Sequence, residues 1–243
     1  MAGPLEQFQI TPIVDGPVDG IAFTNSALWM TITVIVVTIF TVMGMSKREM
    51  VPGRWQSMSE AVYEFIGSMI RENVGDEGRK FFPLIFTLFV FILFGNLLGL
   101  LPGSFTFTSH IIVTLALAVF VFLFVTLVGI AKHGLHFFSF FVPHGAPTWL
   151  YPLMIPIEII SYLSRPLSLA IRLFANMMAG HTMLKVFASF VFGLGAVTAG
   201  VGGILPITMM VALTGFEILV AFLQAYVFTV LTCLYLNDAL HLH

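Results

Sequence analysis

The chain has 243 residues, of which 58% are hydrophobic and only 9% are charged, and its formal net charge is −2. A soluble domain carries about 25% charged residues, so this composition and the mean hydropathy of +1.02 exclude a soluble globular protein and indicate an integral membrane protein. The weakly negative charge excludes a nucleic-acid-binding protein, which needs clustered Lys and Arg. The single Cys233 excludes an internal disulfide.

The N-terminal tail carries Glu6, Asp15 and Asp19 but no basic residue. It also contains no apolar stretch followed by a small-residue cleavage site, so we do not expect it to be a secretory signal. We expect residues 1–25 to be a partly ordered tail on the outer side of the membrane.

Three stretches are long and apolar enough to cross a membrane as helices. A hydrocarbon core about 30 Å thick needs about 20 helical residues, which Ser26–Ser46, Phe81–Leu101 and Ile111–Ala131 each supply. The segment between the first two carries six of the ten basic residues of the chain. The positive-inside rule places this segment on the inner side and the N-terminus outside.

Residues 55–74 of this inner segment have an amphipathic pattern. Apolar side chains recur at helical spacing and charged side chains take most of the other positions. Ser57 followed by Glu60 is typical of a capping box at the start of a helix. We expect this helix to lie flat on the inner membrane face; the alternative is a soluble connector.

No motif for a metal or a cofactor interrupts the apolar segments. The sequence contains no CxxC pair, no HExxH motif and no GxxxxGK(S/T) phosphate-binding loop. His133 and His136 have the spacing of metal ligands, but they follow Lys132 at an expected membrane edge, where polar residues are typical. We expect neither a metal nor a cofactor.

The second half of the chain combines a helical pattern with ionisable residues. A single helix over 149–191 would be about 60 Å long, so this segment either crosses twice with a turn or lies strongly tilted. The Gly-rich run 193–203 is a better turn signal, and an apolar helix over 204–236 follows it. We favour a tilted hairpin of these two helices. The predicted fold is therefore an all-α membrane domain over 26–243 with about five to six membrane helices.

The ionisable residues inside this hairpin are the most informative part of the sequence, because each costs about 2.5–3.5 kcal/mol at mid-membrane. Glu158, Arg165 and Arg172 are seven residues apart, which aligns them along one stripe of a helix. Asn176 continues this stripe, whereas His181 falls about 180° away from Arg172.

A second polar face is expected on the last helix. Glu217 and Gln224 are seven residues apart there, and in the packed hairpin their face could meet His181 or Lys185. Two polar tracts separated by the guanidinium of Arg172 are what a proton path with two non-communicating halves requires.

Structural alternatives stay open for several of these residues. Glu158 and Arg165 could form a buried ion pair that fixes packing, and Lys185 could extend to the nearer interface. His181 could be a hydrogen-bonded core residue, and Asn96, in the second crossing, could hydrogen-bond across helices. Arg172 has no acid three or four residues away in its own helix, so its partner must come from elsewhere, including another subunit.

The run RLFANMMAGH, from Arg172 to His181, closely resembles the signature of the a subunit of F-type ATP synthases. The stretches SRPLSLAIRLF, GNLLGLLPG over 95–103 and FEILVAFLQAYVF over 216–228 are similar to other parts of that family. The similarity covers most of residues 81–236. The order of His181 and then Glu217 resembles that of alphaproteobacterial and mitochondrial members.

The resemblance implies a stator beside a rotating ring of c subunits, without enzymatic activity of its own. Arg172 matches the essential arginine that faces the ring carboxylates, and His181 and Glu217 match paired positions in the half-channel region. Gln224 matches a glutamine that faces the arginine. The other matches to polar channel positions are Asn176 and Glu158.

The same resemblance implies partners and a location. The partners are the c-subunit ring, b-type peripheral-stalk subunits, the remaining synthase subunits and the lipid bilayer, and the location is the bacterial inner membrane or, alternatively, the mitochondrial inner membrane. Gly99 departs from the pattern, because some bacterial members have an acid there, so a role for the first half of the chain in the channel stays open. An ion-coupled secondary transporter, with Arg172 binding an anionic substrate, and a purely structural anchor are the rival interpretations.

Overall fold

The computed structural model describes residues 8–15, 22–46, 51–101, 103–134, 137, 150–197 and 201–241. This part of the chain is helical almost throughout, with one small two-stranded sheet near the N-terminus.

Within the described residues, five helices are long and apolar enough to cross a membrane. They are α1 (Asn25–Ser46), α3 (Phe82–Gly99), α4 (Ile111–His133), α5 (Tyr151–Val197) and α6 (Ile204–Leu240). The predicted all-α membrane fold with a long C-terminal pair of helices is therefore confirmed. Helix α3 follows a short 3-10 helix, η2 (Asp76–Phe81), and two further 3-10 turns, η3 (Phe107–Ser109) and η6 (Val201–Gly203), precede α4 and α6.

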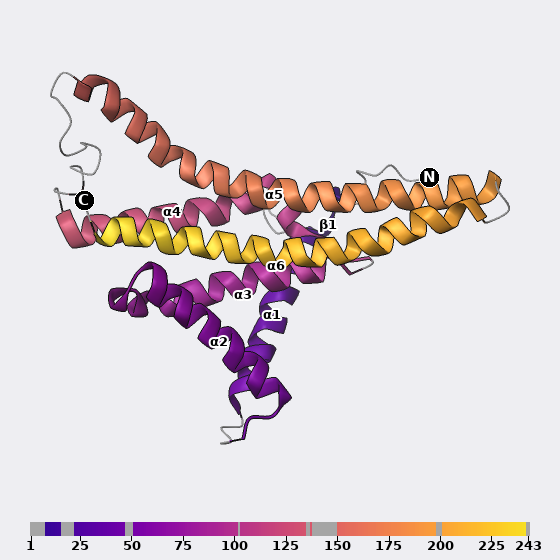
Figure 1. Cartoon of the computed structure of the whole chain (residues 1–243), viewed down its shortest axis with the longest axis horizontal. Helices are drawn as coiled ribbons and strands as arrows, with labels where there is room; N and C mark the ends of the chain where they lie inside the picture. The colour runs from indigo at the N-terminus through magenta and orange to yellow at the C-terminus, as the bar shows by residue number, and fades with distance from the viewer. Residues whose placement is uncertain are drawn as a thin grey trace.

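Helix α5 is one uninterrupted helix of 47 residues that includes Pro156 and Pro166. Of the two arrangements open from sequence, the structure has the single long helix and not two short ones with a turn. Its length of about 70 Å exceeds the hydrocarbon thickness more than twice. Figure 1 shows that α5 and α6 lie side by side toward their shared turn, whereas the first part of α5 bends away from α6.

Helix α6 ends at Leu240, about one turn beyond the predicted end. Its polar residue Asp238 pairs with Arg165 of α5, which gives the last turn a partner. The other helix ends lie within a few residues of the expected positions, except that α5 extends to Val197; Trp149, the expected first residue of this helix, lies outside the described residues.

Helix α2 (Arg54–Asn73) corresponds to the amphipathic helix predicted over residues 55–74. Its Ile66, Met69 and Ile70 are buried where α2 packs against α3 and α6, whereas Trp55 and other apolar side chains of its first half are exposed. The predicted capping box is wrong. The helix begins at Arg54 with Gly53 as the N-cap and no side-chain cap, so Ser57 lies one turn inside it.

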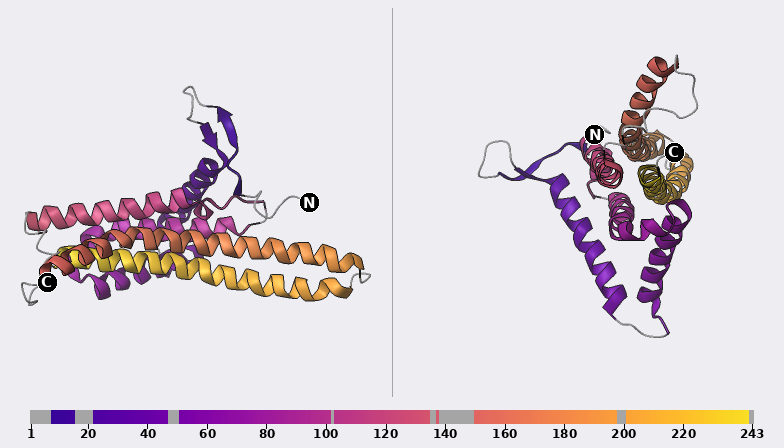
Figure 2. Two further views of the ribbon diagram at one scale, coloured as in Figure 1. Left: turned by 90° about the horizontal axis from the view of Figure 1, so that it is seen from above. Right: turned by 90° about the vertical axis from the view of Figure 1, so that its left-hand side faces the viewer.

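The N-terminal tail contains a β-hairpin that the sequence pattern did not predict. Strands β1 (Pro12–Asp15) and β2 (Ala22–Thr24) pair antiparallel, with a register shift between Pro12 and Val14. Asn25, at the start of α1, accepts a hydrogen bond from Thr11 N at 3.3 Å and donates one to Gln9 O at 3.0 Å. These bonds hold the residues before the hairpin against α1, and Figure 2 shows the hairpin projecting beyond the end of that helix.

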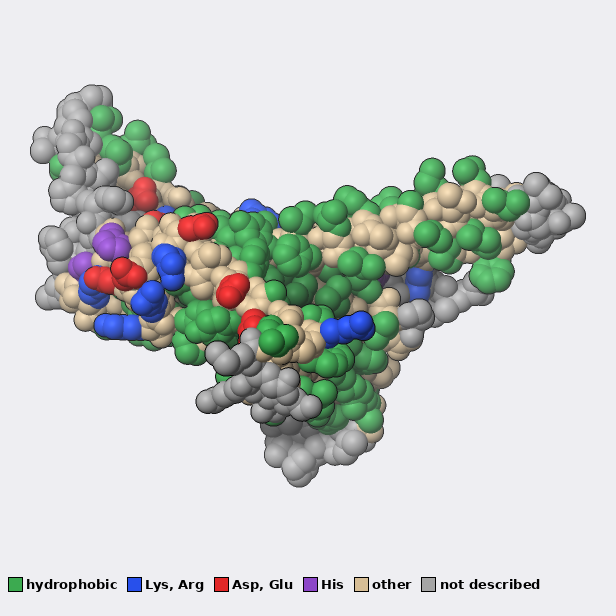
Figure 3. All heavy atoms as spheres, turned by 60° about the horizontal axis from the view of Figure 1, so that its bottom comes forward, with side chains coloured by type: hydrophobic (Ala, Val, Ile, Leu, Met, Phe, Trp, Pro, Cys, Tyr) green, Lys and Arg blue, Asp and Glu red, His purple; other side chains and the backbone are tan. Residues whose placement is uncertain are grey.

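Charged side chains gather at one end of the molecule. Figure 3 shows Lys, Arg, Asp, Glu and His together at the end where α4 and α6 finish. Lys132 of α4 forms an ion pair with Glu77 of η2 there, and His133 lies 3.1 Å from the carbonyl oxygen of Leu240. His136, the other half of the histidine pair, lies outside the described residues. The opposite half of the α5–α6 hairpin is covered mainly by apolar side chains on this face (Figure 3).

Candidate functional site

The two long helices form an open groove that is lined by four of the eight polar residues expected in the hairpin. Arg172, Asn176 and Gly180 line it from α5, and Glu217 and Gln224 line it from α6. The remaining lining residues are mainly apolar: Ala179, Met183, Leu184, Leu213, Phe216, Val220, Leu223 and Val227. Residues spaced by three, four or seven share a helix face, so antiparallel packing brings the two polar stripes together. A mainly apolar groove with one cation is suited to another apolar surface that carries an acid.

Arg172 lies exposed on this groove. Among the described residues, no carboxylate lies within ion-pair distance of it. An unpaired guanidinium at membrane depth is costly, so its position favours a counter-charge supplied by another molecule.

Asn176 and Gln224 connect the two helices beside Arg172. Asn176 Nδ2 donates a hydrogen bond to Gln224 Oε1 across 2.8 Å. Gln224 is buried, and its Nε2 has no hydrogen-bond partner among the described residues. A buried amide with an unused donor marks a position where water or a ligand oxygen can bind.

His181 of α5 and Glu217 of α6 form a buried pair. His181 Nδ1 and Glu217 Oε1 are 2.8 Å apart, and the two residues are only 9% and 5% exposed. Gly180 makes this approach feasible, because a Cβ atom at that position would overlap the Glu217 carboxylate. Glu217 also lines the groove, so its side chain connects the groove to the buried side of the helix pair.

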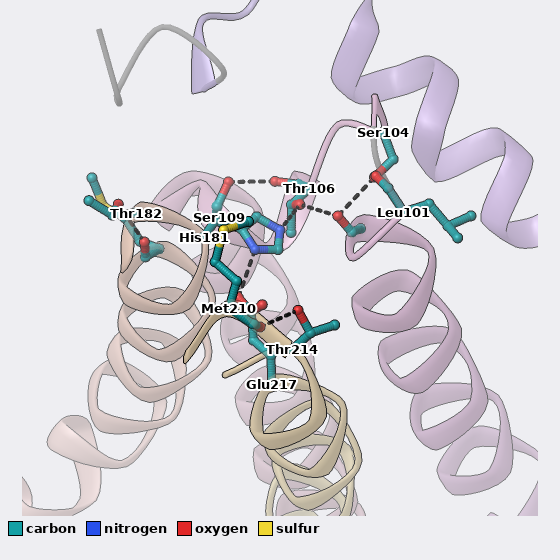
Figure 4. A network of polar contacts seen from close by, with 11 residues as sticks. Leu101, Ser104, Thr106, Ser109, His181, Thr182, Met210, Thr214 and Glu217 are labelled. Atoms are coloured by element: carbon teal, nitrogen blue, oxygen red, sulfur yellow. Dashed lines mark hydrogen bonds and ion pairs between the residues drawn. The ribbon is translucent and has the colours of Figure 1, made fainter. Parts of the chain in front are cut away.

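The second nitrogen of His181 contacts a residue that sequence reasoning missed. Its Nε2 is hydrogen-bonded to Thr106 Oγ1, in the connection between α3 and α4, and Figure 4 shows this contact together with the Glu217 contact. The ring of Phe8, from the N-terminal tail, is stacked on the His181 ring with a centroid distance of 6.5 Å. A cluster of hydroxyl residues between two apolar helices, Ser104, Thr106, Thr108 and Ser109, was the available signal.

The remaining ionisable candidates of α5 lie apart from this pair. The alternative of an ion pair between Glu158 and Arg165 is wrong, because Arg165 Nη1 instead pairs with Asp238 Oδ2 of α6 at 2.9 Å. Arg165 also lies over the rings of Tyr162 and Tyr235, at 5.5 and 4.9 Å from their centroids. Glu158 is half-buried two turns earlier in α5.

Asn96 and Lys185 complete the set of predicted site residues. Asn96 is fully buried, and its Nδ2 lies 3.4 Å from the carbonyl oxygen of Ala221 in α6, which agrees with the alternative of a cross-helix hydrogen bond. Its Oδ1 has no partner among the described residues. Lys185 is half-buried one turn beyond His181.

Just outside the crossing helices, burial lowers the pKa of His110, which stacks on Phe105 in the connection before α4. In the described part of the chain, no three His, Cys, Asp or Glu residues come together in an arrangement that could hold a metal ion.

Comparison with known proteins identifies the family. Residues 27–237 match the family model described as ATP synthase A chain. The chain is 56% identical to ATP synthase subunit a of Rhodospirillum rubrum and 53% identical to that of Paramagnetospirillum magneticum, over the full length of each pair. It is 58% identical to that of Sinorhizobium medicae, over 98% of this chain and 97% of the relative. The chain therefore belongs to the ATP synthase A chain family.

Proposed function

We propose that this protein is a stator subunit of the membrane sector, Fo, of an F-type ATP synthase, and that it guides protons to and from carboxyl groups on a rotating ring of c subunits. The observation that carries this proposal is the exposed Arg172 without a carboxylate partner among the described residues. It lies in a mainly apolar groove that a passing helix could cover.

Arg172 controls ionisation of the ring carboxyl groups. A carboxyl group that faces lipid stays protonated, because burial disfavours its charged form. Opposite Arg172 the fixed positive charge favours the carboxylate, and the proton leaves. Arginine stays charged at physiological pH, so the same side chain repels a proton that would otherwise pass directly between the two half-channels.

The outer half-channel leads through His181 and Glu217. The positive-inside rule assigns the charged end of the molecule to the inner side, which leaves the Thr106 connection and the N-terminal tail outside. Along α5, His181 and Asn176 then lie on the outer side of Arg172. His181 contacts the outer connection through Thr106, and Glu217 lines the groove. An imidazole can both donate and accept a proton, so the pair can relay protons between the two.

The inner half-channel lies on the other side of Arg172. Glu158 is two helical turns before Arg165 on the stripe that leads to the charged end, and we assign it to proton exit. The Asn176–Gln224 hydrogen bond holds α5 and α6 together at the level where the two halves meet. We assign α2 to the inner membrane face, because an amphipathic helix with exposed apolar side chains such as Trp55 and Met58 is suited to contact with lipid there.

The energy comes from the membrane potential and the proton gradient. Each elementary charge that crosses the membrane releases about 2.3 kcal/mol per 100 mV. Several protons together therefore supply enough free energy to drive the rotation that powers ATP synthesis. Nucleotide chemistry takes place on partner subunits, and b-type subunits hold this one against the torque. The complex lies in the bacterial inner membrane.

The decisive experiment compares Arg172→Ala and Arg172→Lys with the unmodified complex in phospholipid vesicles. We expect Arg172→Ala to abolish coupled proton transport and Arg172→Lys to leak or fail, because a lysine can lose its proton in an apolar site. Arg71→Ala, which removes an exposed cation from α2, is the matched control and should transport normally. A c-ring must co-purify with every variant. Normal coupled transport by Arg172→Ala would refute the proposal.

A further inference from the structure

The hydroxyl of Thr106 lies at a point where it can decide the protonation pattern of the His181–Glu217 pair. We propose that Thr106 is a positioning residue: its Oγ1 accepts a hydrogen bond from Nε2–H of His181 and so directs the other ring nitrogen, Nδ1, at Glu217 as the site of a shared proton. This inference rests on the proposed function, because it assigns a task to a residue of the outer half-channel.

The hydrogen bonds around Gly99 give the direction of the Thr106 hydroxyl. Gly99 is the last residue of α3, and its carbonyl belongs to the final turn of that helix, where carbonyl groups lack intrahelical partners. Thr106 Oγ1 lies 3.1 Å from this carbonyl oxygen and has the geometry of a donor to it. Ser104 Oγ lies 2.8 Å from the same oxygen and 2.7 Å from the carbonyl oxygen of Leu101. A serine hydroxyl has a single proton, so Ser104 can donate to only one of these two carbonyl groups at a time.

The hydroxyl proton of Thr106 therefore points at Gly99, and the oxygen is left as an acceptor toward His181. A histidine nitrogen that contacts this acceptor must carry a hydrogen, so the ring is protonated at Nε2. Which nitrogen of a histidine carries the proton is set by the hydrogen bond that the other nitrogen makes. The two ring nitrogens of His181 therefore have different roles. Nε2–H donates to Thr106, and Nδ1 contacts Glu217.

The consequence for Glu217 follows from counting protons. If the ring is neutral and protonated at Nε2, then Nδ1 is an acceptor and the carboxyl group of Glu217 must donate to it. If the ring is charged, Nδ1–H donates to the carboxylate. In either form one proton lies between Nδ1 and Oε1, which are 2.8 Å apart. Removal of that proton leaves two lone pairs facing one another, which is unfavourable.

Gly99 is part of the same arrangement. A Cβ atom at this position would lie 2.8 Å from the side chain of Thr106, so any larger residue would push the hydroxyl away from the Gly99 carbonyl. The absence of a side chain at Gly99 thus has a structural reason in this chain. It allows Thr106 to reach His181.

Among the residues that the structure describes, few ionisable groups lie near His181. Helix α6 contributes Glu217, the connection around η3 contributes His110, and α5 itself carries Lys185 and, on its opposite face, Arg172. Helix α3 carries no ionisable side chain, and those of α4, Lys132 and His133, lie at its far end. Only Glu217 contacts the ring directly among these.

The test uses the intact complex in phospholipid vesicles and three variants. Thr106→Val removes the hydroxyl at nearly constant shape, Thr106→Ser retains it, and Thr108→Val removes a neighbouring buried hydroxyl that has no partner among the described residues. Proton-driven ATP synthesis is measured over a series of outer pH values at a constant pH difference. We expect the half-maximal pH of Thr106→Val to move toward acid by roughly half to one pH unit.

The direction of this shift has a clear reason. Without the hydroxyl, the neutral ring can carry its single hydrogen on Nδ1 and donate it to the carboxylate, so the pair no longer needs the shared proton and releases it at lower pH. Thr106→Ser should restore the original profile, and Thr108→Val should not change it. Nitrogen NMR of complex with labelled histidine reports the tautomer directly, and the spectrum of His181→Gln assigns the signal.

An unchanged pH profile in Thr106→Val would overturn the inference, and so would a neutral His181 protonated at Nδ1 in the unmodified complex. If Thr106→Val does not assemble with a c-ring, the NMR spectrum of the unmodified complex still tests the inference, because it reports which nitrogen of His181 carries the proton. The Arg172→Ala variant distinguishes failure of this inference from failure of the proposed function. If only the inference about Thr106 is wrong, Arg172→Ala is still inactive; if the proposed function is wrong, Arg172→Ala is active.

Discussion

Gly180 gives the sharpest prediction about how packing supports transport. Alanine is favoured over glycine inside a helix by about 1 kcal/mol, so Gly180→Ala would stabilise α5 if nothing else changed. A Cβ atom at this position, however, overlaps Oε1 of Glu217 and lies 2.9 Å from its Cγ and Cδ. The carboxylate is the end of a flexible side chain, and we expect it to move while the helices stay packed.

Movement of this carboxylate breaks the contact with His181. A hydrogen bond to a charged group is worth about 1.5–3 kcal/mol, which is more than the helix gains from alanine. We therefore expect Gly180→Ala to assemble with a stability about 0.5–2 kcal/mol lower than that of the unmodified complex and to lose most proton-driven ATP synthesis. Gly215→Ala is the matched control, because a Cβ atom on this α6 glycine meets nothing within 4 Å.

The assay combines ATP synthesis in vesicles with thermal unfolding of the purified complex. Loss of transport with normal assembly in Gly180→Ala, and normal transport in Gly215→Ala, are the expected results. Full activity of Gly180→Ala would show that the distance between Glu217 and His181 does not limit transport, and it would refute this reasoning. Failure of both variants to assemble would instead show that α5 and α6 do not tolerate any added methyl group.

Two further predictions concern stability. Asp238→Asn removes the carboxylate charge that pairs with the partly buried Arg165, so we expect thermal unfolding of the complex at lower temperature. The exchanged pair Arg165→Asp with Asp238→Arg should recover part of the loss, and no change would show that the pair is dispensable. The pKa of His110 is lowered by burial from an ordinary value of 6.5, so the unfolded chain binds a proton there more readily than the folded chain, and stability falls as the pH drops below that value. His110→Gln should lose stability less steeply with acid than the unmodified complex, whereas parallel pH curves would contradict this assignment.

The alternative of an ion pair between Glu158 and Arg165 was wrong for a physical reason. Glu158 and Arg165 share a stripe because they are seven residues apart, but that spacing separates them by about 10 Å along the axis, and direct side-chain contacts in a helix join residues three or four apart. The spacing predicts a shared helix face, but it does not identify the partner of Arg165. Asp238, more than seventy residues away in sequence, is brought to Arg165 only by the packing of α5 against α6.

The local start of α2 and the N-terminal hairpin were missed for a different reason. Ser57 and Glu60 have the spacing of a capping box, yet Gly53 provides the extended backbone at which the helix begins. The strands β1 and β2 are too short to give an alternating pattern, and Asn25 holds the residues before the hairpin through contacts with Gln9 and Thr11.

The sequence by itself determined the membrane class, the order of the helices and the absence of an acid three or four residues from Arg172 in its helix. Hydropathy, helical period and local charge balance are properties of contiguous residues. It also placed His181 on the face opposite Arg172, since that relation needs only the helical angle. The tertiary structure alone decided that His181 meets both Glu217 and Thr106, and that Arg165 meets Asp238. Such contacts join segments that are distant in the chain, and they depend on the distance and register at which helices pack, which small residues such as Gly99 and Gly180 set.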